Sequence, residues 1–223
     1  MVELAKISPQ TYRLDGYDIS DASFSSADTL PSNVTLNVGD FKTPFPEHLH
    51  GQYDLVNIRL VISIMGEGVW ESTLRNALTL LKPGGAIQWV EGNFITARGY
   101  RGASPTSTKG YYLTLARRKV NSVQKERIGL NFPDFINLFQ DAGLHNIEED
   151  VSSTDRLPEL RQKFTDQMVG ALFRLLKNLA STKTEGYWSE EEVDGFHEKA
   201  VADMQSGAYL RWDLHVTIGF TSK

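Results

Sequence analysis

The sequence predicts an α/β fold with a doubly wound, mainly parallel sheet. Short apolar runs with strand-like spacing alternate with helix-periodic segments through the first half of the chain. The second half reads as mostly helical and ends in a strand-like tail. Strands that alternate with helices usually form a parallel sheet. Because no helix follows the last strand, it is expected to enter antiparallel, at or near an edge.

The composition fits one globular domain spanning residues 1–223. The chain is 40% hydrophobic, has a formal net charge of −5 and contains no cysteine. A disulfide scaffold and thiolate chemistry are therefore excluded. The mildly acidic balance argues against binding to nucleic acid or to an anionic membrane. No apolar run approaches the roughly 20 residues of a membrane span, and no secretory signal is visible. We therefore expect a cytoplasmic protein.

The predicted elements of the first half follow from periodicity and turn residues. A helical fragment over 2–6 is ended by Pro9. Strands are expected over 12–19, 34–38, 53–58 and 86–90, the third of them covered on both faces because it is almost continuously apolar. A helix is expected over 70–81, and the stretch 92–109, rich in Gly, Ser and Thr, is expected to be an irregular loop.

In the second half, helices dominate. An apolar face predicts a helix over 132–142 that ends at Gly143, followed by a strand over 144–151. Leucines and aromatics at helical spacing predict a helix over 157–179. Ser189 and Glu192 form a capping-box pattern for a helix that runs through residue 204. These helices form a predicted cap, about 155–206, inserted before a final strand over 209–220.

Polar residues stand where the predicted strands end, which is where parallel sheets bind ligands. They are Asp18, Asp40, Asn57 with Arg59, and Glu91 with Asn93. A carboxylate at Asp18 can accept two hydrogen bonds from a ribose diol, and it fits a strand-to-loop turn equally well. Asp40 can accept from an exocyclic amine of adenine, although a turn residue is the simpler interpretation.

Other site chemistries find little support. The five histidines form no ligand set, and His48 and His50 share a polar loop, so no metal site is predicted. There is no P-loop, GxGxxG or nucleophile-elbow pattern. No residue is identified as a catalytic base.

A series of short motifs occurs in an informative order. It comprises YDIS (17–20), VGD (38–40), YDLVNIR (53–59), LLKPGG (80–85), WVE (89–91) and VTIGF (216–220). Over nearly the whole chain this resembles the class I S-adenosylmethionine-dependent methyltransferases, particularly the small-molecule enzymes of fungal secondary metabolism. The resemblance implies a Rossmann-like methyltransferase sheet and S-adenosylmethionine as the cofactor.

The resemblance also implies roles for the cofactor-binding residues. Asp18 would hold the ribose diol, and Asp40, with Phe41 beside it, would contact the adenine. Asn57 and Arg59 would lie near the methionine moiety and the methyl group.

On the acceptor side, the resemblance assigns the pocket to the end of the fourth strand. Trp89, Glu91, Asn93 and the loop after them would shape the pocket, and the helices from 157 to 204 would cover it.

The sequence departs from the family pattern at its start, where neither the family's first strand nor its Gly-rich turn is visible. We therefore expect an N-terminally truncated methyltransferase sheet in which the strands ending at Asp18 and Asn57 still share one sheet. Weak or no binding of S-adenosylmethionine by the isolated monomer is also expected, as is a homodimer or partner chain that covers the open edge.

The predicted function is methyl transfer from S-adenosylmethionine to a small natural product. Two alternatives stay open at this point. One is a methyltransferase-derived cyclase or isomerase that transfers no methyl group, and the other is a non-catalytic partner subunit.

Overall fold

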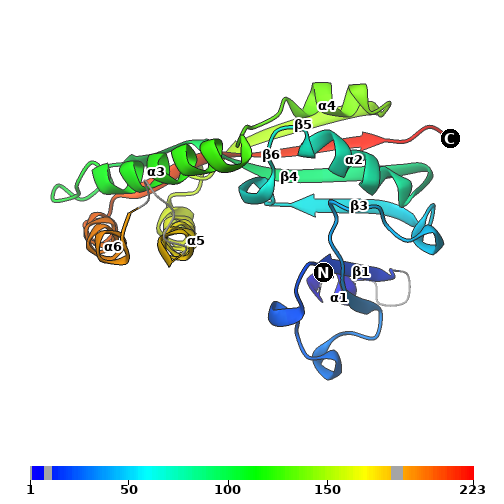
Figure 1. Ribbon diagram of the computed structural model, residues 1–223, viewed down its shortest axis with the longest axis horizontal. Helices are drawn as coiled ribbons and strands as arrows, with labels where there is room; N and C mark the ends of the chain where they lie inside the picture. The colour runs from blue at the N-terminus through cyan, green and yellow to red at the C-terminus, as the bar shows by residue number, and fades with distance from the viewer. Residues whose placement is uncertain (1, 8–11, 182–187) are drawn as a thin grey trace.

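The computed structural model describes residues 2–7, 12–181 and 188–223. The main sheet has the strand order β3-β4-β6-β5, with β3 at Tyr53–Arg59, β4 at Leu81–Tyr100, β5 at His145–Ser153 and β6 at Tyr209–Phe220. β3 and β4 pair in parallel, and β6 runs antiparallel to both β4 and β5. Three strands therefore share one direction and the last strand is reversed, as the sequence predicts (Figure 1).

The first two strands form a separate sheet. β1 (Leu14–Asp18) pairs in parallel with β2 (Val34–Val38), and this two-stranded sheet lies beside β3 without a backbone ladder to it (Figure 1). Side chains make the connection, because the Tyr53 hydroxyl donates to Asp15 at 2.9 Å and lies 3.4 Å from the Tyr17 hydroxyl. The expectation that the strands ending at Asp18 and Asn57 share one sheet is therefore wrong.

β4 is far longer than expected and replaces the first half of the predicted loop, residues 92–100. The expected strand over 86–90 continues to Tyr100, because β6 pairs with it along this length, with a register shift between Asn93 and Arg98. A short connection then leads to α3 (Tyr111–Ile128), a helix that the sequence analysis did not predict. The connection passes so close to β4 that a Cβ on Gly99 would lie 2.0 Å from the Gly110 carbonyl oxygen.

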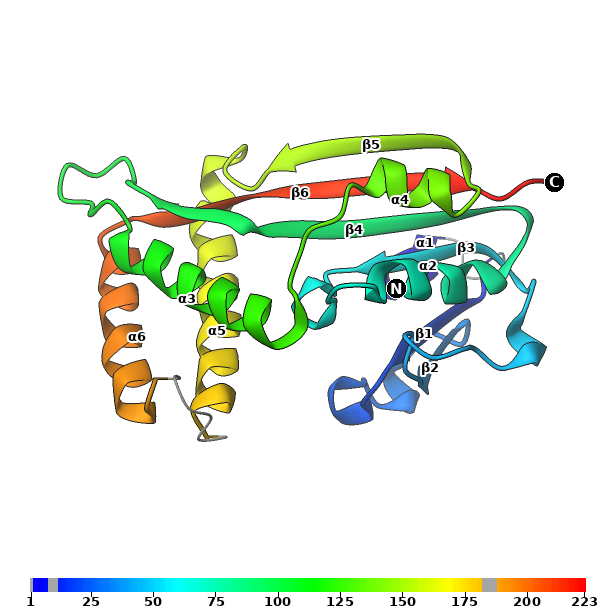
Figure 2. The same cartoon turned by 45° about the horizontal axis from the view of Figure 1, so that its top comes forward.

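One face of the main sheet is covered by α2 (Val69–Thr79) and α4 (Phe135–Asp141), as Figure 2 shows. The core beneath them is built around Trp70, Trp89 and Phe135, whose rings are 5.6–5.7 Å apart. Gly143 follows α4 with a φ of 81°, the conformation for which glycine is suited at a helix end.

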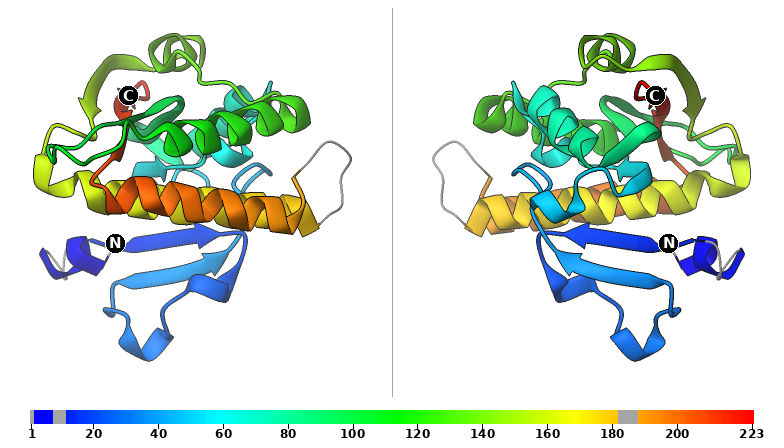
Figure 3. Two further views of the ribbon diagram at one scale, coloured as in Figure 1. Left: turned by 90° about the vertical axis from the view of Figure 1, so that its left-hand side faces the viewer. Right: turned by 90° about the vertical axis from the view of Figure 1, so that its right-hand side faces the viewer.

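The predicted cap is a helical unit around the far ends of β4 and β6. It combines α3 with α5 (Arg161–Ser181) and α6 (Glu190–Gln205), which lie side by side in Figure 3. Its apolar core is distinct from the one beneath α2 and α4, and the Phe94 ring packs against both.

Two further features concern the surface. The other face of β3 is open, with Leu55 53% exposed, so the expectation that this strand is covered on both faces is wrong. The short helix α1 (Val2–Ile7) precedes β1. Within the described part of the chain, no helix combines the length and apolarity needed to cross a membrane.

Candidate functional site

Asp18 lies at the exposed end of β1. Its Oδ1 accepts a hydrogen bond from the backbone N–H of Ser20 at 3.1 Å, which is a turn contact. Its backbone carbonyl accepts from the N–H of Gly39 at 2.8 Å, so the ends of β1 and β2 are tied together. The carboxylate remains exposed, and the turn contact and a role in binding are compatible at this position.

Asp40 and Phe41 follow β2 at the end of the small sheet where Asp18 also lies, because Asp18 is in register with Val38 and the two strands are parallel. Asp40 Oδ1 accepts from the N–H of Lys42 at 3.0 Å, again a turn contact. Asn76 of α2 donates to the Lys42 carbonyl at 2.9 Å, and the Phe41 ring packs against the core beneath α2. The loop after β2 is therefore anchored to the main sheet.

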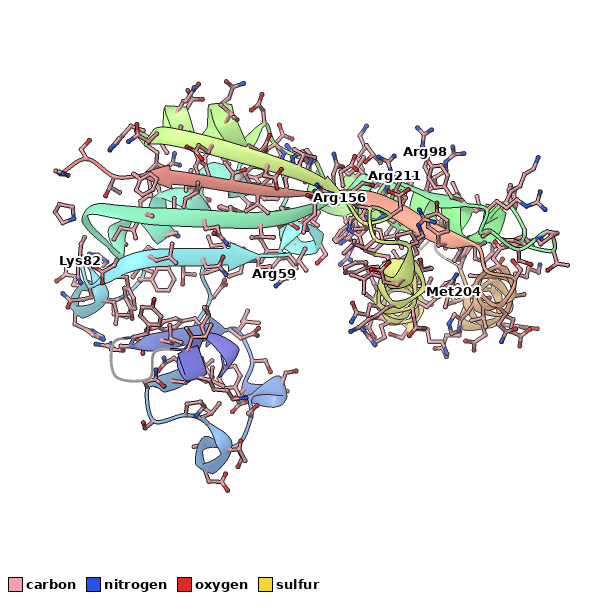
Figure 4. The ribbon with its side chains drawn as sticks, turned by 180° about the vertical axis from the view of Figure 1, so that it is seen from behind. Arg59, Lys82, Arg98, Arg156, Met204 and Arg211 are labelled. Carbon is pink, nitrogen blue, oxygen red and sulfur yellow. The ribbon has the colours of Figure 1, made fainter. Side chains whose placement is uncertain are left out.

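Asn57 and Arg59 project from the open face of β3. Asn57 Oδ1 accepts from Gln88 on the neighbouring strand at 3.2 Å. Arg59, at the carboxyl end of β3, is exposed and has no hydrogen-bond or ion-pair partner among the described residues (Figure 4). The two side chains lie on one face of the strand, since they are two residues apart.

Trp89 and Glu91 project from β4 toward the opposite, helix-covered face. Trp89 is 1% exposed and packs between Trp70 and Phe135 in the core. Its predicted contact with an acceptor stays a prediction, and its position in the core explains its size and burial without one.

Glu91 is fully buried and fixes the segment that follows β3. One carboxylate oxygen accepts from the N–H of Val61 at 2.8 Å, and the other accepts from the N–H of Gly92 at 3.0 Å. Burial raises the pKa of Glu91 to about 7, while the backbone N–H groups act against this shift. The residue joins the segment that follows β3 to the middle of β4.

Asn93 lies at the register shift of β4, and its side-chain oxygen is buried with no hydrogen-bond partner within the part of the chain that the structure describes. Its backbone carbonyl accepts from Thr96 at 3.2 Å.

The sequence analysis missed a row of polar residues on α3. Arg117 donates to the Phe94 carbonyl at 2.8 Å, Asn121 to the Ile95 carbonyl at 3.1 Å and Gln124 to the Ser63 carbonyl at 2.7 Å. They tie the segment after β3, and the part of β4 at its register shift, to the helix. Burial lowers the pKa of Arg117 to about 9. Their spacing, four and then three residues, places them on one helix face and was the available signal.

Apart from Asn93, at the register shift of β4, the predicted site residues form three groups. Asp18, Asp40 and Phe41 share the edge of the small sheet, whereas Asn57 and Arg59 lie on the open face of β3. The Trp89 and Glu91 side chains lie in the interior, on the opposite face of the main sheet.

Comparison with known proteins places these features in context. No family model matches the chain. A methyltransferase from Penicillium sp, grgD, is 29% identical over 214 residues, which are 94% of this chain and 72% of that protein. The N-methyltransferase tcpN of Claviceps purpurea is 24% identical over 224 residues, covering 98% of this chain and 78% of its own.

Solved structures show the same fold. The chain is similar to phosphoethanolamine N-methyltransferase 2 of Haemonchus contortus, which was solved with S-adenosyl-L-methionine. The TM-score is 0.50 at 15% identity, with 99% of this chain covered. This chain spans 46% of the length of that protein. In sequence and in fold, the chain is methyltransferase-like.

Proposed function

We propose that this chain, a relative of the class I S-adenosylmethionine-dependent methyltransferases, binds S-adenosylmethionine and methylates a small natural product of secondary metabolism. The observation that carries the proposal is the strand order of the main sheet, in which a reversed last strand lies between β4 and β5. Similarity to fungal methyltransferases over nearly the entire chain supports it.

The residues at the strand ends suit the cofactor. The exposed carboxylate of Asp18 can accept hydrogen bonds from a ribose diol, because only one of its oxygens is engaged by the turn to Ser20. Asp40 offers a second acceptor and Phe41 an apolar surface for the adenine, both on a loop anchored to α2. Asn57 and Arg59 provide polar groups for the charged amino acid end, which needs partners when it is buried.

When bound, S-adenosylmethionine would supply a methyl group on a sulfonium sulfur; an acceptor atom would bond to the methyl carbon as the bond from sulfur to that carbon breaks, and S-adenosylhomocysteine would leave. The task of this chain is then mainly positioning. The Glu91 carboxylate accepts from the backbone N–H groups of Val61 and Gly92, and the Gln124 side chain donates to the Ser63 carbonyl. These bonds hold the segment after β3 against β4 and α3. The chain therefore presents a rigid edge to the cofactor and the acceptor.

For the acceptor, we propose a small molecule enclosed by the middle of β4 and the helical cap. Trp89, Glu91 and Asn93 lie midway along β4, level with the carboxyl end of β3. One relative is named an N-methyltransferase, which favours an amine as the acceptor group.

For the assembly, we propose that the chain works as a homodimer or with a partner chain. β3 is an edge strand of the main sheet, and both strands of the small sheet are edges as well. An unpaired edge that carries an exposed leucine, such as Leu55, is a surface that pairs readily with another strand.

Calorimetric titration with S-adenosylmethionine, repeated with S-adenosylhomocysteine, tests the cofactor assignment. We expect Asp18→Ala to weaken binding roughly ten- to hundredfold, because hydrogen bonds to a charged group contribute about 1.5–3 kcal/mol. The matched control is Asp150→Ala, which removes an exposed carboxylate from the strand β5 at the other edge of the sheet. If Asp18→Ala binds as tightly as the wild type, the ribose assignment is wrong. If the wild type binds neither ligand, the proposed function fails.

A further inference from the structure

A small polar cleft lies on the extension of β4 and β6, beyond the predicted site residues. Its volume is about 210 Å³, and it is lined by Thr96, Arg98, Tyr100, Arg211, Trp212 and Asp213. We propose that this cleft binds a small oxyanion, a carboxylate or a phosphate group, between Arg98 and Arg211. The inference does not depend on the proposed methyl transfer.

The two arginines directly oppose each other across the β4–β6 ladder. Directly opposed residues of antiparallel strands project from the same face, so both guanidinium groups belong to one side of the ribbon. Figure 4 shows them close together there. Like charges placed in this way repel each other. The neighbouring carboxylates of Asp155 and Asp213 lie against Arg211, so among the described residues it is Arg98 that lacks a counter-charge.

Arg211 is held in a fixed orientation. Its Nε donates to the Ser153 hydroxyl at 2.7 Å, and its Nη2 lies 3.3 Å from an oxygen of Asp213. Asp155 lies 3.4 Å from Nε. The carboxylates of Asp155 and Asp213 thus already interact with the Arg211 guanidinium, and Asp213 is engaged before any ligand binds.

Arg98 has no such partner. It is exposed, and the described residues offer it no hydrogen bond or ion pair. The planar guanidinium carries a fork of N–H donors that matches a carboxylate or a phosphate. An oxyanion in the cleft would satisfy these donors and screen the repulsion from Arg211, with the Tyr100 hydroxyl as an additional polar group in the lining.

The size of the cleft limits the ligand. At about 210 Å³ it is smaller than the ~300–1,000 Å³ of pockets that bury drug-sized ligands. The net charge of −5 gives no general attraction for anions, so binding must depend on the local arginine pair. This combination favours one small oxyanionic group over a polyanion such as nucleic acid.

Titration with inorganic phosphate and, separately, with acetate tests the proposal, with the Nε–Hε NMR signals of the arginines as the readout at constant ionic strength. We expect saturable shifts of the Arg98 and Arg211 signals with at least one of the two anions. Arg98→Gln should weaken that binding about tenfold or more. Arg118→Gln is the matched control, because Arg118 is an exposed arginine on α3.

Stability provides a second readout that does not need the assigned signals. Because Arg98→Gln removes the repulsion, the variant should unfold in chloride buffer at the same or a higher temperature than the wild type. Addition of the anion should raise the unfolding temperature of the wild type and of Arg118→Gln, but not that of Arg98→Gln. Shifts that do not saturate, or an equal response of the two variants, would overturn the proposal.

Discussion

At Glu91, complete burial and two backbone hydrogen bonds act on the same carboxylate in opposite directions. Burial disfavours the charged form and raises its pKa to about 7, whereas the N–H groups of Val61 and Gly92 favour it. Because burial is the larger effect, the native carboxyl keeps its proton at pH values where the unfolded chain has released it. The residue therefore links the stability of the protein to pH.

The predicted pH dependence has a definite sign. Since the pKa rises from 4.5 to about 7 on folding, the free energy of unfolding should fall as the pH rises between these values, by about 3 kcal/mol. Glu91→Gln should abolish this fall, so that the variant gains stability relative to the wild type from pH 5 to pH 8. Urea unfolding across this range measures it, and Glu148→Gln, an exposed carboxylate on β5, is the control. A constant difference between Glu91→Gln and wild type would contradict the assignment.

At the scale of elements, α6 begins at the capping box that the local sequence predicts. The Ser189 side chain accepts from the N–H of Glu192 at 3.2 Å, and the Glu192 side chain accepts from the N–H of Ser189 at 2.7 Å. Both bonds of the predicted capping box are present. They fix the start of a helix that contributes Val193 and Ala200 to the core of the helical cap.

Removal of this cap should destabilise the protein measurably. Ser189→Ala is expected to lower the free energy of unfolding by about 1 kcal/mol, because it leaves a helical N–H without its acceptor. Glu191→Ala provides a comparison, since Glu191 lies in the same first turn but takes no part in the capping box. Thermal and urea unfolding measure both, and equal effects of the two substitutions would show that the capping bonds add little.

At the scale of the whole molecule, the open edge of β3 determines the expected assembly. Leu55→Lys places a charge on this edge and should shift the protein toward the monomer, as sedimentation across a concentration series would show. Val151→Lys makes the equivalent change on β5 at the other edge of the sheet, where Val151 is 49% exposed. If Val151→Lys dissociates the assembly and Leu55→Lys does not, the interface lies on the other edge. A wild type that is monomeric and binds S-adenosylmethionine would refute the proposed assembly.

The sequence alone determined those features that depend on local patterns. Periodicity located α2 and the strands β2 and β3, and the residue chemistry of helix ends located Gly143 and the Ser189 cap. The order of the motifs along the chain predicted the methyltransferase-like fold, because it resembles the order in which class I methyltransferases carry polar residues at the ends of their strands.

Only the tertiary structure decided where these elements meet. The length of β4 depends on its pairing with β6, more than a hundred residues away. Because local composition does not report this pairing, the Gly-, Ser- and Thr-rich stretch 92–109 was predicted to be a loop. The division into two sheets depends on which strand edges are paired, a relation that no local pattern encodes. The burial of Glu91 and the opposition of Arg98 and Arg211 also arise from long-range pairing, because neither carboxylate nor guanidinium reveals in sequence what will lie across the sheet from it.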